Sequence, residues 1–216
     1  MKEKTIKSNN ATEVKKVDKN SHFIKNQKVA ILTKTALFAA ISALLMYIEF
    51  PLPFMPPFLK VDLSGVAILM AAFMIGPWNA VLANAVKDLI HLMSTQTGGV
   101  GELADFLVIS AFAVTAALIY DKHKDKKHAL IGILCGMAVM TVTGALANKF
   151  MLIPFYAKVM PIDAIISACA KVNPFIGNIN TYVIFGAAPF NLIKGGILSG
   201  ITWILYKRVS NIIHKI

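Results

Sequence analysis

The chain has 216 residues, of which 56% are hydrophobic and only 15% charged, yet its formal net charge is +11. A typical soluble domain has about 25% charged residues, so this composition excludes an ordinary soluble enzyme. The two cysteines and five scattered histidines form neither a disulfide framework nor a zinc-ligand spacing. A basic excess can indicate nucleic-acid binding, and the position of the charges along the chain tests that interpretation.

Residues 1–28 contain eight lysines, three acidic residues and no apolar periodicity. We interpret this segment as a basic, disordered cytoplasmic tail. It does not match a signal peptide, because a long polar stretch precedes a full-length apolar segment. Residues 29–216 are then expected to form a single membrane domain.

Six apolar segments follow the tail, separated by short polar or proline-containing breaks: 29–49, 63–75, 79–93, 102–120, 128–156 and 181–206. The first has about 20 residues, enough to cross about 30 Å of hydrocarbon as a helix. The second and third are short, and Pro77 ends one of them. We expect these two to form a hairpin packed within the bundle. The pattern predicts an all-α integral membrane protein with six transmembrane helices in a compact bundle.

Lysine and arginine residues are distributed unequally between the two sides of this arrangement. With a cytoplasmic N-terminus, the inner segments carry fifteen of them and the outer loops three. The positive-inside rule therefore predicts that both termini are cytoplasmic. The net charge of +11 then serves as an orientation signal beside anionic lipid, and nucleic acid is not expected as a partner.

The first outer loop, residues 50–62, contains four of the nine prolines and should be stiff. Phe50, Phe54 and Phe58 would present apolar faces, either as an interfacial anchor or as a lid over a planar ligand. Asp62, at the end of this loop, could cap the second helix or contact the ligand.

The second outer loop, residues 94–105, has three glycines within four positions. It lacks the Lys-Ser/Thr ending of a phosphate-binding loop, so nucleotide hydrolysis is not predicted there. Glu102 and Asp105 share one helix face. They are either acids favoured by the helix dipole or ligand contacts.

Polar residues within the apolar segments are candidates for function, because burying an unpaired charge in a membrane is costly. Lys194 lies near the middle of the sixth segment, with Asn191 on the same face. Lys194 could contact a ligand or pair with a carboxylate such as Asp88. Asn148 could face the same cavity or bond a neighbouring helix. Lys87 and Asp88 are expected to be a structural pair or to face the cytoplasm.

Small residues recur four positions apart in the first segment, at Ala36 and Ala40 and at Ala39 and Ala43. Such spacing lets another helix approach closely. The approaching helix could belong to a partner or to the same bundle.

Taken together, several of these motifs resemble the riboflavin-specific S components of energy-coupling factor (ECF) vitamin transporters. The resemblance covers residue 29 to the C-terminus and rests on five stretches: 50–59 with Asp62, Gly76-Pro77, 101–106, Asn148 with 154–156, and 189–195. The proline-rich loop and the segment Phe190-Asn-Leu-Ile-Lys-Gly195 are the most specific. Asp105 departs from the pattern, which has asparagine at that position.

The resemblance implies a transport protein of the cell membrane that captures riboflavin at the outer face. It would need no cofactor and perform no catalysis, and it would work with a membrane T component and two ATP-binding subunits. By resemblance, Asn148, Asn191 and Lys194 contact the flavin, and the loop containing Phe58, Leu59 and Val61 closes over it. Further candidate contacts are Asp62, Glu102 and Asp105. The T component would meet Ala36 and Ala40, or alternatively Ala39 and Ala43.

Two other functions remain open at this point. The chain could be an S component for another vitamin, such as pantothenate or thiamine. A membrane-embedded enzyme acting on lipid is less favoured, because no clustered acid–base or metal-binding set is apparent.

Overall fold

The structure, a computed structural model, describes residues 26–56 and 58–213. The predicted basic tail lies outside this range except for residues 26–28, which already belong to the first helix, Asn26–Met46. The chain divides into two units, Met1–Lys34 and Thr35–Ile216. The described part of the first unit is the beginning of this helix, and everything below concerns the second unit.

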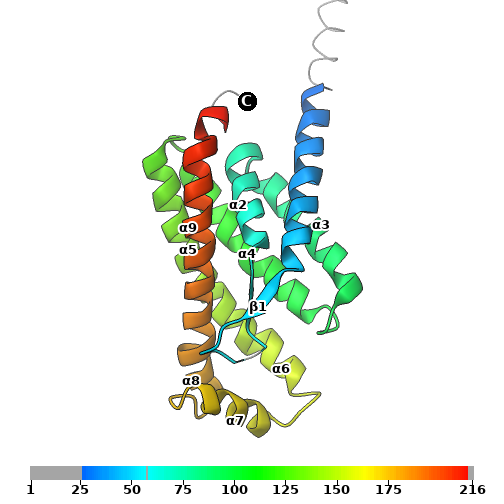
Figure 1. Cartoon of the computed structure of the whole chain (residues 1–216), viewed down its shortest axis with the longest axis vertical. Coiled ribbons are helices and arrows are strands. Elements are labelled where there is room, and N and C mark those ends of the chain that lie inside the picture. The colour runs from blue at the N-terminus through cyan, green and yellow to red at the C-terminus, as the bar shows by residue number, and fades with distance from the viewer. Residues whose placement is uncertain (1–25, 57, 214–216) are drawn as a thin grey trace, which may run out of the picture. The chain divides into compact units, whose positions relative to one another are not determined.

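Helices dominate the second unit, as the apolar pattern predicted (Figure 1). The only strands among the described residues are β1 (Glu49–Pro51) and β2 (Lys60–Asp62). The helices are α2 (Ser64–Ile75), α3 (Pro77–His91), α4 (Val100–Tyr120), α5 (Lys126–Ala147), α6 (Ile153–Tyr156), α7 (Ile162–Val172), α8 (Ile179–Tyr182) and α9 (Ala188–Ile213). Three further short turns are η1 (Leu92–Ser94), η2 (Asn148–Leu152) and η3 (Val183–Ala187).

Four helical segments in the described ranges are long and apolar enough to cross a membrane. They are Asn26–Met46, Val100–Tyr120, Lys126–Tyr156 and Ile179–Arg208. The chain is therefore a multi-pass membrane protein. Of the two short predicted segments, α2 is apolar but only 12 residues long, and α3 has 15 residues.

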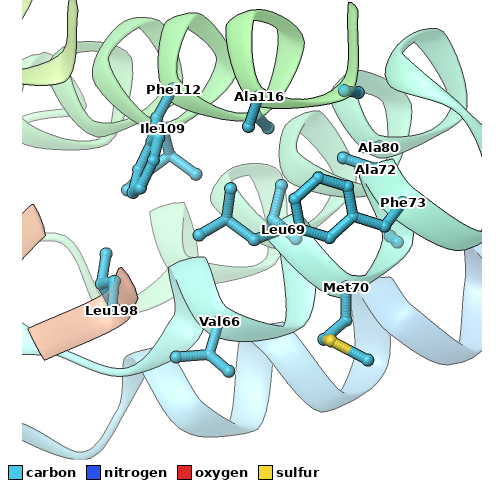
Figure 2. Close-up of a cluster of buried hydrophobic side chains, with 14 of the residues drawn as sticks. Val66, Leu69, Met70, Ala72, Phe73, Ala80, Ile109, Phe112, Ala116 and Leu198 are labelled. Carbon is cyan, nitrogen blue, oxygen red and sulfur yellow. The ribbon is translucent and has the colours of Figure 1, made fainter. Parts of the chain in front are cut away.

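The helix α2 lies in the centre of the bundle. Its residues Ser64 to Phe73 are all buried, as expected for a helix that is apolar on every side. Leu69 of α2, Ile109 of α4 and Leu198 of α9 belong to the same buried apolar cluster (Figure 2). The prediction that the short segments pack inside the bundle is confirmed for this helix.

The neighbouring helix α3 is different, because only one of its faces is buried. Trp78 and Leu89 are exposed, whereas Ala80, Ala83 and Lys87 are fully buried. Between the two helices, Gly76 has a φ of 89°, a conformation that favours glycine, and Pro77 begins α3. The Gly-Pro pair therefore makes the sharp turn that the sequence predicted.

Two elements were missed in the segments that the sequence predicted to be outer loops. The proline-rich loop is closed by a short antiparallel hairpin, in which Phe50 lies opposite Val61. The long loop at residues 157–180 contains the helix α7, whose Ile165 and Cys169 are buried. Both elements pack near α6 and α8 and cover one end of the bundle (Figure 1).

Candidate ligand-binding site

A cavity of about 620 Å³ lies beside the hairpin and the run from α5 to α6. Its walls come from the hairpin, α3, α4, α9 and the run from α5 to α6. Eight of the nine predicted ligand contacts line it: Phe58, Leu59, Asp62, Glu102, Asp105, Asn148, Asn191 and Lys194. Val61 does not line the cavity, because it is fully buried in the apolar cluster behind the hairpin.

Two π-helical turns shape the wall that carries the asparagines. The turn η2 ends two residues before Pro154, and η3 ends two residues before Pro189. Proline lacks an N–H and collides with the carbonyl four residues earlier, so a helix that continues through it must widen. Asn148 lies at the start of η2 and Asn191 lies just after η3. The prolines that looked like helix breakers therefore shape the helices beside these two amides.

Each asparagine is held in place by its own helix. Asn148 Nδ2 donates to the Gly144 carbonyl at 2.9 Å, and Asn191 Nδ2 donates to the Ala187 carbonyl at 2.8 Å. The Tyr182 hydroxyl donates to Asn148 Oδ1 at 2.7 Å. An amide group has two N–H donors, and the second on each side chain has no protein acceptor among the described residues. Both amides are buried and preoriented, with a donor left over.

The second polar wall is an ion-pair cluster around Lys194. Its Nζ lies 2.7 Å from Asp62 Oδ2 and 3.0 Å from Asp105 Oδ1. The other oxygen of Asp105 lies 2.5 Å from Lys87 Nζ, which is also 3.1 Å from Asp88 Oδ1. The suggestion of Asp88 as the counter-charge of Lys194 was wrong. The Lys87–Asp88 pair is present, but Lys87 is fully buried and does not face the cytoplasm.

Asp62 has two roles at once. Besides its ion pair, its Oδ1 accepts a hydrogen bond from the backbone N–H of Ser64, the first residue of α2, at 2.9 Å. It also accepts from the Ser64 hydroxyl. The side chain thus satisfies a free N–H donor at the start of a buried helix, as expected if Asp62 caps the second helix. Its other oxygen pairs with Lys194.

Glu102 forms a separate polar group at the start of α4. Its carboxylate accepts hydrogen bonds from Thr95 Oγ1 at 2.9 Å and Thr97 Oγ1 at 3.2 Å, and lies 3.0 Å from His91 Nδ1. Only 5% of the residue is exposed, so it is not a solvated acid at a helix end. His91, the last residue of α3, and the two threonines after it were missed, because isolated polar residues give no periodic signal. The run Ser94-Thr-Gln-Thr97 before the glycines was the available clue.

The aromatic residues of the proline-rich loop divide into two groups. Phe58 packs against Tyr156 and Tyr182, with ring centroids 5.3 and 6.1 Å apart. Phe50 and Phe54 are exposed and do not line the cavity. Of the three apolar faces expected from the sequence, only that of Phe58 belongs to the site.

The two alanine pairs of the first helix face in different directions. Ala39 and Ala43 are buried, at 2% and 5% exposure, whereas Ala36 and Ala40 are exposed. Ala39 and Ala43 therefore pack inside the molecule and are not available to a partner. This corrects the alternative in which these two alanines meet the T component. No group of three or more metal-binding side chains occurs in residues 26–56 and 58–213.

Comparisons with known proteins agree with this arrangement. A family model described as the substrate-specific component of ECF transporters matches residues 31–206. The riboflavin transporter RibU of Staphylococcus aureus (strain TCH60) is 31% identical over 185 residues, covering 86% of this chain and 93% of the relative. The riboflavin transporter FmnP of Bacillus subtilis (strain 168) is 27% identical over 175 residues, covering 80% of this chain and 87% of the relative.

A solved structure of the S component of a bacterial ECF transporter also has this fold. It superposes with a TM-score of 0.69 at 29% identity, covering 86% of this chain and 98% of that one. The family match extends over most of the chain and includes every residue that lines the cavity. The chain belongs to the family of substrate-specific components of ECF transporters.

Proposed function

We propose that this protein captures riboflavin for an ECF importer and is a transport component, not an enzyme. The curated relatives RibU and FmnP are riboflavin transporters. The observation that carries the proposal is the cavity itself, which combines aromatic side chains with two preoriented amides and a charge-balanced lysine. Its volume of about 620 Å³ lies within the range of about 300–1,000 Å³ typical of small-molecule sites.

The isoalloxazine ring of riboflavin is flat, apolar on its faces, and edged by carbonyl and nitrogen acceptors and one imide N–H. Phe58 and Tyr156 can cover its face. Asn148 and Asn191 can donate to its polar edge through their remaining N–H groups. Leu59 contributes apolar surface to the same wall.

Lys194 suits a neutral ligand because its charge is already balanced. An ammonium has three N–H donors, and two of them are directed at Asp62 and Asp105. The third N–H can donate to a flavin carbonyl or to a ribityl oxygen, and the ligand need not carry a charge to balance the lysine. The counter-charges also offset much of the cost of burying the lysine.

The ribityl chain needs donors and acceptors for its hydroxyl groups. The Glu102 cluster supplies them at the same cavity, through the carboxylate and the hydroxyl of Thr97. We therefore place the ring between the asparagines and Phe58, and the ribityl chain toward Glu102.

A riboflavin titration of the purified protein tests this function directly. Flavin fluorescence is the appropriate signal, because neither Trp78 nor Trp203 lines the cavity. Stacking on Phe58 and Tyr156 should quench the flavin until one equivalent is bound. Saturation by pantothenate or thiamine, with no response to riboflavin, would overturn the choice of substrate.

We further propose six transmembrane helices with both termini in the cytoplasm. The distribution of lysine and arginine, fifteen against three, supports this orientation. Single cysteines at Lys124 and Lys171, in a chain with Cys135 and Cys169 replaced by serine, test it in intact cells. An impermeant maleimide should label position 171 and not position 124, and the reverse pattern would contradict the orientation.

The partners we propose are a membrane T component and two ATP-binding subunits, with Ala36 and Ala40 meeting the T component. The support is that these two alanines are exposed on one helix face, where small side chains permit close approach. The basic tail, residues 1–28, would lie beside anionic lipid of the inner leaflet. Co-expression with an ECF module, followed by purification through a tag on this chain, tests the assembly.

A further inference from the structure

Lys87 is the one fully buried lysine in the described part of the chain. It lies in α3 and does not line the cavity. Its ammonium nevertheless lies 2.5 Å from Asp105 Oδ2, and Asp105 does line the cavity. Removing a charged side chain from water costs free energy. A buried lysine that contacts a cavity residue, but does not line the cavity, therefore requires an explanation.

Asp105 connects the two lysines. Its Oδ1 accepts from Lys194 at 3.0 Å, and its Oδ2 accepts from Lys87 at 2.5 Å. Lys194 belongs to α9, Asp105 to α4 and Lys87 to α3, so the carboxylate bridges lysines of two other helices. A carboxylate engaged at both oxygens cannot rotate without breaking one of these charge-assisted bonds.

The orientation of Asp105 matters for Lys194. With Asp62 and Asp105 both in place, two N–H groups of the ammonium are fixed, and the direction of the third is determined. Without Lys87, Asp105 Oδ2 would lose its hydrogen-bond donor inside the bundle. The carboxylate would then compete for the remaining N–H of Lys194, or draw water into the site.

We propose that Lys87 is a positioning residue for the riboflavin site: it acts through Asp105 to aim the free N–H of Lys194 into the cavity. This inference rests on the proposed function, since it assigns a role within that site. The inference also goes beyond that function, because it assigns a role in binding to a residue that does not line the cavity.

A double-mutant cycle in riboflavin affinity tests this proposal, with Lys87→Met, Asp105→Leu, which removes the acceptors of both lysines, and the combined variant. Each single substitution should weaken binding by about tenfold or more, the effect of losing a well-placed charge-assisted hydrogen bond. Because Lys87 acts only through Asp105, the combined variant should bind within about twofold of Asp105→Leu. A purely structural lysine would instead give losses that multiply. Lys122→Met, at an exposed turn, is the matched control and should bind like the wild type.

The combined variant also covers the case in which Lys87→Met alone fails to fold. It removes one positive and one negative charge together, so the net charge of the cluster is unchanged, and Asp88 is the one carboxylate that loses its partner. A further tenfold loss on adding Lys87→Met to Asp105→Leu would overturn the proposal. Wild-type affinity in Asp105→Leu or in folded Lys87→Met would do the same. Failure of the wild type to bind riboflavin would instead refute the proposed substrate, and the same cycle could be run with the ligand that binds.

Discussion

Lys194 Nζ lies 2.7 Å from Asp62 Oδ2, although 132 positions separate these residues in the chain. Asp62 ends strand β2 and also bonds the first N–H of α2. The ion pair therefore joins the hairpin, the central helix and α9 at one point. The polar wall of the cavity can form only when all three elements are in place, which couples the binding site to the folding of the whole bundle.

The first prediction concerns this pair. Asp62→Asn keeps an acceptor for the Ser64 N–H and removes only the charge that faces Lys194. Breaking a buried pair costs about 3–5 kcal/mol, and we expect the lower end because Asp105 still holds Lys194. Thermal unfolding in detergent should show this loss, and riboflavin affinity should fall by about tenfold.

Glu49→Gln is the control for Asp62→Asn. It removes the Glu49–Lys60 ion pair, whose two side chains are about one-third exposed, at 36% and 32%. Exposed pairs contribute about 0–1 kcal/mol, so the unfolding temperature should barely change. Equal destabilisation by the two substitutions would show that burial of the Lys194 pair has no special importance.

The second prediction uses a glycine in the cavity wall. A Cβ at Gly144 would overlap the side-chain amide of Asn191, whereas a Cβ at Gly196 would have no atom within 4 Å. Gly144→Ala should therefore displace Asn191 and weaken riboflavin binding by about tenfold or more, as the loss of a positioned donor would. Gly196→Ala should leave binding intact and add about 0.5–1 kcal/mol of stability, since alanine is the better helix former.

Riboflavin titrations of the two alanine variants, done side by side, measure this difference. Similar affinities would mean that Asn191 does not contact the flavin. In that case Asn191 would be removed from the proposed site.

The third prediction concerns the hydroxyl that holds Asn148. Tyr182→Phe removes the donor to Asn148 Oδ1 and leaves the ring that packs on Phe58. A neutral hydrogen bond contributes about 0.5–1.5 kcal/mol, so riboflavin affinity should fall by about two- to tenfold. Tyr206→Phe, whose hydroxyl faces Tyr120 away from the cavity, should not change it. A Tyr182→Phe variant with wild-type affinity would show that the Asn148 orientation is fixed by Gly144 alone.

The helical bundle and most of the residues that line the cavity could be predicted from the sequence alone. Long apolar runs and the Gly76-Pro77 turn correspond to local physical requirements, which a sequence shows directly. Lys194 stood out because a charge in an apolar segment needs a partner. The identity of that partner was not predictable, because it depends on how α2, α4 and α9 are rotated against one another.

The hairpin and α7 were missed for different reasons. Prolines normally argue against strands, and each strand here has only three residues. In α7 the buried positions Ile165 and Cys169 are four residues apart, a spacing typical of helices. That signal extends over only 11 residues and was taken as part of a loop. The role of Lys87 was hidden as well, since it depends on a contact 18 residues away through Asp105.

The fourth prediction concerns Asp88, the outermost member of the ion cluster. The cluster has three carboxylates, on Asp62, Asp88 and Asp105, against the ammoniums of Lys87 and Lys194. Neither oxygen of Asp88 accepts a hydrogen bond of good geometry from the described residues. Replacing a poorly satisfied buried charge with a neutral group is often neutral or stabilising.

Asp88→Asn should therefore leave the unfolding temperature unchanged or raised, with riboflavin affinity within about twofold of the wild type, because Lys87 keeps Asp105. Asp105→Leu, one helix away, is the contrasting variant, because it removes an acceptor from both Lys87 and Lys194. A loss of affinity in Asp88→Asn as large as that of Asp105→Leu would mean that Lys87 depends on Asp88, and that the whole cluster acts as one unit.

The fifth prediction separates ligand capture from assembly. Ala40 is exposed on the first helix and does not line the cavity. Ala40→Trp should keep riboflavin affinity unchanged while blocking the close helix approach that small residues permit. Co-purification of the T component should fall by about tenfold or more, because a tryptophan prevents tight helix packing at such a seam. Leu118→Trp, on an exposed position of α4, is the control for a bulky lipid-facing side chain. Normal recovery of the T component with Ala40→Trp would place the partner surface on another face of the protein.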